Sequence, residues 1–148
     1  MREYEILYLQ HGKRNIQING SRSLELNYSN IALLRPNIIH QTFSCDDSTQ
    51  TRILINISPQ LISQITNTYS EKVISCFNSP ILELERYDVG MMNYFFTELL
   101  ENKKTNPLYE EKIKINLSKI LVHLSEIYYS THTQRESFLN TLTQERIN

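Results

Sequence analysis

The sequence has little of what several specialised folds and sites require. Its 148 residues contain no tryptophan, three glycines, four prolines and two cysteines. Three glycines are too few for a phosphate-cradling loop, so a P-loop nucleotide site is excluded. Cys45 and Cys76 stand far apart and in no metal or redox spacing. We therefore expect two reduced thiols, with Cys76 filling a core.

Long apolar runs and a strong charge of either sign are also missing. No run approaches the roughly 20 apolar residues that cross a bilayer, and the N-terminus has no signal-peptide pattern. Fifteen basic and 16 acidic residues leave a net charge of −1, without the basic stripe of a nucleic-acid surface. The length fits one domain. We expect a cytoplasmic protein that by itself contacts neither membrane nor DNA.

The first half of the chain has the pattern of antiparallel strands. Residues 15–18 and 23–26 alternate polar and apolar side chains, which gives each strand one apolar face at a period of two. Between them, Asn19 and Gly20 favour a tight turn, because both residues tolerate positive φ. The segments 4–9 and 31–34 are apolar on both faces. We expect them to lie between a barrel interior and covering helices.

From Tyr87 onward the apolar period becomes helical, which predicts an antiparallel pair of helices at about 87–101 and 108–129. In the last helix, a coiled-coil seam is formed by Ile113, Leu117, Ile120, Leu124 and Ile127, and Tyr128 widens it. Because earlier helices already cover the barrel, we expect these six residues to form a homodimer interface. The alternative is that the seam packs against the chain's own core.

These patterns predict an α+β fold in three parts. Residues 1–84 would form a small jelly-roll β-barrel with short helices, and residues 85–130 a helical dimerisation part. Residues 131–148 begin with a polar run and would serve as a linker or tail.

Several stretches of the β half resemble one known family. They are Tyr4-Glu5-Ile6-Leu7-Tyr8-Leu9, Ile18-Asn19-Gly20, Leu33-Leu34-Arg35-Pro36 followed by His40, and Ile53-Leu54-Ile55-Asn56-Ile57-Ser58-Pro59. The segment from Tyr4 to Pro59 is similar to the N-terminal cupin domain of AraC-type transcription regulators, and a looser resemblance continues to about Ser130. The resemblance implies a non-enzymatic domain that dimerises and binds a small effector such as a sugar. DNA would be bound only through a helix-turn-helix domain that this chain does not contain.

The resemblance also implies where a cupin metal site would lie. Glu5 matches the glutamate of the metal-binding cupins, and His40 matches their later histidine. The two upstream histidines are missing or replaced by Met1, Arg2 and Glu3. Two ligands are fewer than zinc or iron sites require, so we expect neither a metal nor a cofactor. The alternative function is a stand-alone cupin enzyme of the sugar isomerase or dioxygenase type, which a stoichiometric bound metal would favour.

Glu5, Arg35 and His40 are the candidate ligand-binding residues. A carboxylate on an interior face must be paired, hydrogen-bonded or protonated. Glu5 either accepts hydrogen bonds from an effector or lies partly in water beside Arg35 or another cation. His40 either donates to the same effector or is satisfied by a backbone carbonyl. Arg35 either clamps an anionic group of the ligand or covers apolar surface with its stem.

Overall fold

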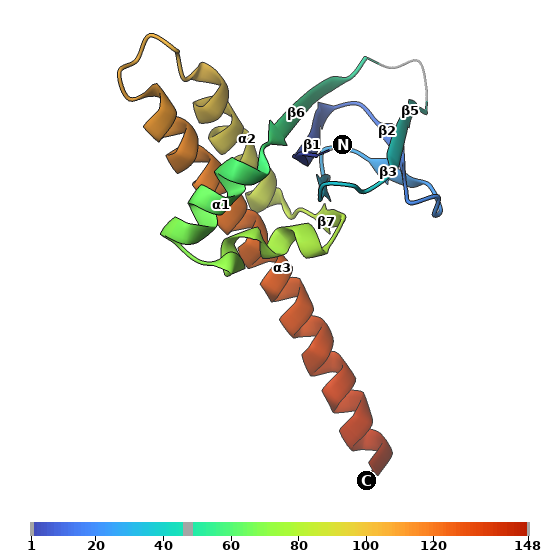
Figure 1. Cartoon of the computed structure of the whole chain (residues 1–148). Coiled ribbons are helices and arrows are strands. Elements are labelled where there is room, and N and C mark those ends of the chain that lie inside the picture. The colour runs from blue at the N-terminus through green and yellow to red at the C-terminus, as the bar shows by residue number, and fades with distance from the viewer. Residues whose placement is uncertain (1, 46–48, 148) are drawn as a thin grey trace.

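The structure, a computed structural model, describes residues 2–45 and 49–147, with side chains described as far as residue 132. The strands are β1 (Tyr4–His11), β2 (Arg14–Ile18), β3 (Leu24–Leu26), β4 (Asn30–Leu34), β5 (His40–Ser44), β6 (Thr51–Ile57) and β7 (Ile81–Glu83). The helices are α1 (Pro59–Thr68), the 3₁₀ helix η1 (Glu71–Asn78), α2 (Arg86–Glu101) and α3 (Tyr109–Ile147). The predicted α+β architecture is confirmed (Figure 1).

The strands form two antiparallel sheets that face one another, as in the predicted jelly roll, but closure into a barrel is not shown. The larger sheet has the order β6-β1-β4-β7 and the smaller one the order β3-β2-β5. No ladder between the described residues joins the two sheets. Their facing sides share a buried aliphatic cluster, which consists of Leu7, Leu9, Ile16, Ile18, Leu26, Ala32 and Leu34. We call these facing sides the inter-sheet face.

Strand β1 is buried on both sides because successive side chains of a strand point to opposite faces. Leu7 and Leu9 contribute to the inter-sheet face, whereas Ile6 and Tyr8 belong to a second cluster under the helices. All five residues of β4 are buried as well. The prediction that these two strands lie between the sheet interior and the helices is confirmed.

The helices cover the outer side of the larger sheet (Figure 1). α2 and α3 run antiparallel and contact one another, and α3 also packs along η1. Ser125 of α3 links the two, because its Oγ accepts from the Cys76 N–H at 3.1 Å and donates to the Val73 carbonyl at 2.9 Å. The helical part is therefore tied together by polar as well as apolar contacts.

Two local predictions from the sequence are confirmed. Ser58 caps α1 with its side chain, which accepts from the backbone N–H of Leu61 at 3.1 Å, and Pro59 occupies the first helical turn. Asn19 and Gly20 have φ values of 52° and 71°, as the tight turn after β2 requires.

Helix α3 continues well past its predicted end near Tyr129 and reaches Ile147. The sequence contains no proline or glycine after Pro107, so no residue forces the helix to stop where the chain becomes polar. The segment expected to be a linker is therefore helical. None of the helices formed by the described residues is both long and apolar enough to cross a membrane.

The expected coiled-coil seam of α3 faces the chain's own core. Leu117, Ile120 and Leu124 are at most 2% exposed. Ile113, Ile127 and Tyr128 are half-buried, and the last two pack against the same core cluster. The assignment to a dimer interface is corrected for Leu117, Ile120 and Leu124, which one chain already covers, and it stays a prediction for the three half-buried residues.

The two thiols should differ in reactivity. Burial raises the pKa of the Cys76 thiol from its ordinary value of 9.0 to about 11, whereas Cys45 is exposed. Because the thiolate is the reactive form, we expect DTNB at about pH 8 to modify one thiol quickly in the native protein. Cys45→Ser should abolish that fast reaction, and Cys76→Ser should not.

The same shift has a consequence for stability. The unfolded thiol ionises near 9 and the folded one near 11, so unfolding releases a proton between these values. The contribution of Cys76 to stability should therefore fall as the pH rises above about 9, and Cys76→Ser should remove that part of the slope in urea titrations. Two fast thiols in the native protein would contradict the buried position.

Candidate functional site

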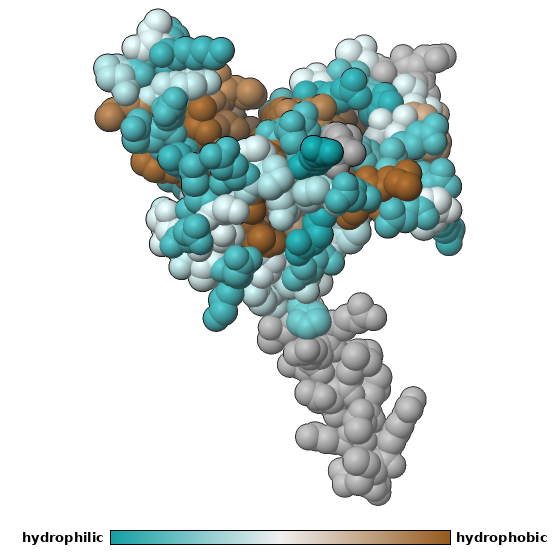
Figure 2. Space-filling model, in the orientation of Figure 1, coloured by the Kyte–Doolittle hydropathy of each residue, from teal (hydrophilic) through white to brown (hydrophobic). Residues whose placement is uncertain are grey.

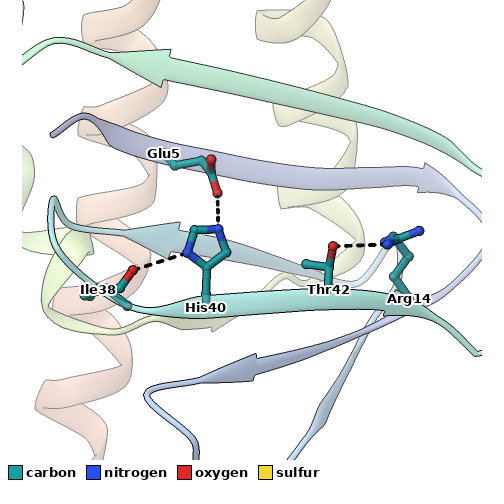
Figure 3. A network of polar contacts seen from close by, with 5 residues as sticks. All are labelled: Glu5, Arg14, Ile38, His40 and Thr42. Atoms are coloured by element: carbon teal, nitrogen blue, oxygen red, sulfur yellow. Dashed lines mark hydrogen bonds and ion pairs between the residues drawn. The ribbon is translucent and has the colours of Figure 1, made fainter. Parts of the chain in front are cut away.

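The structure brings Glu5 and His40 together across the two sheets (Figure 3). Glu5 lies on β1 of the larger sheet and His40 on β5 of the smaller one. The Nε2 atom of His40 is 2.9 Å from Oε2 of Glu5. Glu5 is only 5% exposed and His40 is half-buried. The carboxylate is therefore enclosed, and its partner is a histidine and not Arg35.

Both ring nitrogens of His40 face oxygen atoms. Nδ1 lies 3.3 Å from the Ile38 carbonyl, which can only accept, so Nδ1 carries the proton of that contact. The contact between Nε2 and Glu5 needs one further proton, on the ring or on the carboxyl group. The expected contact of His40 with a backbone carbonyl is therefore present and Glu5 is a further partner, whereas donation to an effector stays a prediction.

Arg35 does not reach this pair. Its Nε donates to the Phe77 carbonyl at 3.2 Å and its Nη2 donates to Oδ1 of Asn78 at 2.6 Å. These bonds hold the end of η1 against the residue that follows β4. Two of its donors are thus used within the chain, so Arg35 has a structural role, and its role as a ligand clamp stays a prediction.

Arg14 of β2 is an inter-sheet residue that the sequence analysis did not single out. Its position shares a strand face with Ile16, because side chains repeat at a period of two. Its Nη2 donates to Oγ1 of Thr42 at 3.1 Å (Figure 3), and its Nη1 donates to Oε1 of Gln50 at 3.3 Å and Oγ of Ser44 at 3.4 Å. From the sequence alone, the alternation of residues 14, 16 and 18 could have placed Arg14 on the same strand face as Ile16 and Ile18.

The inter-sheet face is uncovered along β6, an edge strand of the larger sheet. Asn56 and Leu54 lie opposite Glu5 and Leu7 in the ladder, so they share the inter-sheet side. Both are exposed, and Leu54 is 52% exposed. In Figure 2, apolar surface also lines the notch between the tip of the α2–α3 pair and the sheets, which lies on the helical side of β6 in Figure 1. This edge is the accessible side of the interior.

The inter-sheet face therefore has two polar ends and an aliphatic middle. His40 lies opposite Ile18 in the ladder, and Ser44 lies opposite Arg14. The backbone positions of His40 and of the residue opposite Arg14 are thus four residues apart along β5, or about 13 Å, and the guanidinium reaches back to Thr42, two residues from His40. No group of three or more His, Cys, Asp or Glu among the described residues is placed to hold a metal ion.

A second histidine–carboxylate pair connects the helices. Nε2 of His123 on α3 lies 2.9 Å from Oδ1 of Asp88 on α2. The other oxygen of Asp88 accepts from the Glu85 N–H at 3.1 Å and completes a capping box at the start of α2. We assign this pair to the packing of α2 on α3.

No family description and no curated protein matches this sequence. Solved structures with the same fold include an apo lysine-to-alanine variant of ToxT from Vibrio cholerae strain SCE256, with a TM-score of 0.61 at 14% identity over 87% of this chain. Wild-type ToxT of that strain bound to an unsaturated fatty acid has a TM-score of 0.52 at 17% identity over 86% of this chain. ToxT from V. cholerae O395 bound to (E)-4-(8-methylnaphthalen-1-yl)but-3-enoic acid has a TM-score of 0.54 at 18% identity over 86% of this chain.

The chain spans about half the length of these ToxT chains, with 49%, 48% and 50% of them covered. The likeness establishes that this chain has the fold of that half of ToxT.

Removing one member of the Glu5–His40 pair should leave the other unsatisfied in the interior. We expect Glu5→Leu and His40→Leu each to lower the free energy of unfolding by about 1–3 kcal/mol. The double variant should lose less than the sum, because an isolated buried polar group is then absent. Urea unfolding measures all four proteins. Additive losses would show that the two side chains do not interact.

Proposed function

We propose that this chain is the effector-binding domain of an AraC-type transcription regulator. The observation that carries the proposal is the inter-sheet face, where an enclosed polar pair lies beside aliphatic side chains and an uncovered edge strand. Two independent observations support it, namely the sequence resemblance and the shared fold with ToxT, an AraC-family regulator. DNA would be bound by a helix-turn-helix domain outside this chain.

The chemistry of the inter-sheet face favours an effector with an apolar body. Seven aliphatic residues form its buried cluster, so a molecule that entered between the two sheets would contact mostly hydrocarbon. The ToxT structures with a fatty acid and with an arylbutenoic acid support a carboxylic acid of this kind. A sugar, which the sequence resemblance suggests, is the second class to test, since Glu5 and His40 offer hydrogen bonds to hydroxyl groups.

The fold provides a direct route from this site to the far end of the chain. β6 leads through Ser58 into α1, which contacts η1 and α3. A ligand at the β6 edge would therefore act on the base of the long helix. Binding shifts such an equilibrium only by its difference in affinity for the two arrangements.

We also propose a homodimer, through a different face of α3 from the seam. Leu108, which immediately precedes α3, and Ile115, Val122 and Tyr129 of the helix follow one another at intervals of seven residues, and their exposed fractions lie between 38% and 60%. We call these four residues the outer stripe. A seven-residue repeat of exposed apolar side chains on a helix fits against a second helix. Beside Ile115 and Val122, the surface is hollowed by about 400 Å³.

The charges beside the outer stripe favour an antiparallel second copy as the occupant. Lys119 and Glu126 both line the hollow and are also seven residues apart. If two copies of α3 cross antiparallel near Val122, Lys119 of one copy lies beside Glu126 of the other. A parallel arrangement would instead place like charges together, at a cost in stability.

The effector proposal is tested by thermal shift with decanoate and with a panel of sugars. At 100 times its Kd a ligand adds about 2.7 kcal/mol, or on the order of 5–10 °C for a chain of this size. Leu54→Asp at the β6 edge should abolish the shift by an apolar ligand. Leu100→Asp, a change at an exposed leucine of α2, should retain it. Glu5→Gln should weaken the binding of any ligand that donates a hydrogen bond to the carboxylate. If the thermal shift is unchanged in both Leu54→Asp and Glu5→Gln, the ligand binds elsewhere.

The dimer proposal is tested by light scattering on matched helix variants. Val122→Lys should give a folded monomer, because losing about 1.5–3 kcal/mol of burial in each of the two copies weakens the dimer by roughly 100- to 10,000-fold. Leu124→Lys, two residues away, should unfold the chain, because it buries a charge in the core.

A charge exchange tests the antiparallel arrangement. Lys119→Glu alone should weaken the dimer, and Lys119→Glu with Glu126→Lys should restore it. A monomeric wild-type chain, or an unchanged dimer in Val122→Lys, would refute the outer stripe as an interface.

A further inference from the structure

The 3₁₀ helix η1 borders the outer stripe of α3. A hollow of about 160 Å³ has Val122 and Tyr129 of the stripe and Val73 of η1 in its lining. We propose that η1 sets the affinity of the homodimer, because Ser75 of η1 holds the ring of Tyr129 in the position that a second copy meets. This inference rests on the proposed homodimer and names the element that controls its affinity.

One hydrogen bond joins the outer stripe to η1. The hydroxyl oxygens of Ser75 and Tyr129 lie 2.7 Å apart. Ser75 is 9% exposed and Tyr129 is 41% exposed, so the phenol oxygen reaches a nearly buried partner and the exposed part of Tyr129 is mostly its ring. A tyrosine at a wet surface commonly has its hydroxyl end in water. The reversed orientation of Tyr129 offers its apolar ring to a partner.

The ring of Tyr129 is also held from the side by Tyr128. The two rings lie edge to face, with centroids 5.5 Å apart and an angle of 72° between their planes. Tyr128 is half-buried and packs against the helical core cluster. A side chain that is already ordered in the monomer loses less conformational freedom when a partner covers it. The two contacts of Tyr129 therefore favour dimerisation.

η1 is fixed on two sides and can serve as a rigid support. Ser125 of α3 bonds to the backbone of η1 at two points. Arg35, which follows β4, donates to two groups at the C-terminal end of η1. η1 is thus tied both to α3 and to the larger sheet. A displacement of η1 along α3 would separate Ser75 from Tyr129 and release the ring.

The antiparallel arrangement places an apolar side chain of the second copy beside this ring. Tyr129 lies seven residues after Val122 in one copy, and Ile115 lies seven residues before it in the other. If the two helices cross near Val122, Tyr129 therefore lies beside Ile115 of the second copy. Ile115 is 51% exposed in the single chain. The held ring gives this isoleucine a preformed surface to cover.

Sedimentation equilibrium of Ser75→Ala, Tyr129→Phe and the double variant tests the inference. Ordering one side chain at an interface costs a factor of about 2–10 in affinity. The two-fold symmetry of the dimer applies that factor twice, so each single variant should weaken the dimer by roughly 5- to 100-fold. The double variant should be no weaker than either single variant, because all three lack the same hydrogen bond.

Two control variants separate dimer affinity from stability. Thr66→Val removes a hydroxyl that is also 9% exposed and whose hydrogen bond stays within α1. Tyr28→Phe removes the phenol oxygen of an exposed tyrosine between β3 and β4. Both controls should keep the wild-type dimer affinity. Ser75→Ala combined with Val122→Lys should still unfold cooperatively in urea, because the bond to Tyr129 supports the interface and not the fold.

The outcomes separate this inference from the proposed homodimer. A wild-type dimer whose affinity is unchanged in Ser75→Ala and in Tyr129→Phe would overturn the role of η1 and leave the interface standing. Losses that add up in the double variant, or a loss in one single variant but not in the other, would show that the two residues act separately and would also overturn it. A monomeric wild-type chain would refute the homodimer itself. If Ser75→Ala does not fold, Ser75→Cys takes its place, since a thiol is only a weak hydrogen-bonding group.

Discussion

The whole structure depends on burying both faces of β1. A strand with Ile6 and Tyr8 on one side and Leu7 and Leu9 on the other needs an apolar layer against each. The helices supply one layer and the smaller sheet supplies the other. Successive side chains of a strand point to opposite faces. Glu5 therefore lies on the same side as Leu7 and Leu9 and faces the smaller sheet, where His40 is its partner.

The inter-sheet face gains its chemical character from that constraint. Its middle is aliphatic, one end holds a paired carboxylate, and the other holds a cation without an acidic partner among the described residues. Strand β6 keeps one edge of this face accessible and then leads directly into the helical part. Ligand binding and its proposed effect on α3 are therefore linked through neighbouring elements of the chain.

The features that were predictable from the sequence follow local rules. Alternation identified the strands, Ser58 and Pro59 marked the start of α1, and the apolar character of residues 4–9 placed them between layers. Helix α3 was harder, because it carries two apolar stripes. Spacing alone does not say that Leu117 and Leu124 face inward while Val122 faces solvent. Closure of the barrel and the role of Arg35 depend on long-range contacts, which a single sequence does not reveal. Arg14 was detectable from its alternation, but its contacts were not.

The central claim is that an effector binds between the sheets, and methyl NMR of leucine-labelled protein tests it most directly. Leu7, Leu9, Leu26, Leu34 and Leu54 report on the inter-sheet side, while Leu117, Leu121 and Leu124 report on the helical core. Addition of decanoate should shift the first group strongly, and the second group weakly through α1. Shifts confined to the helical leucines, or to none of these residues, would contradict the account.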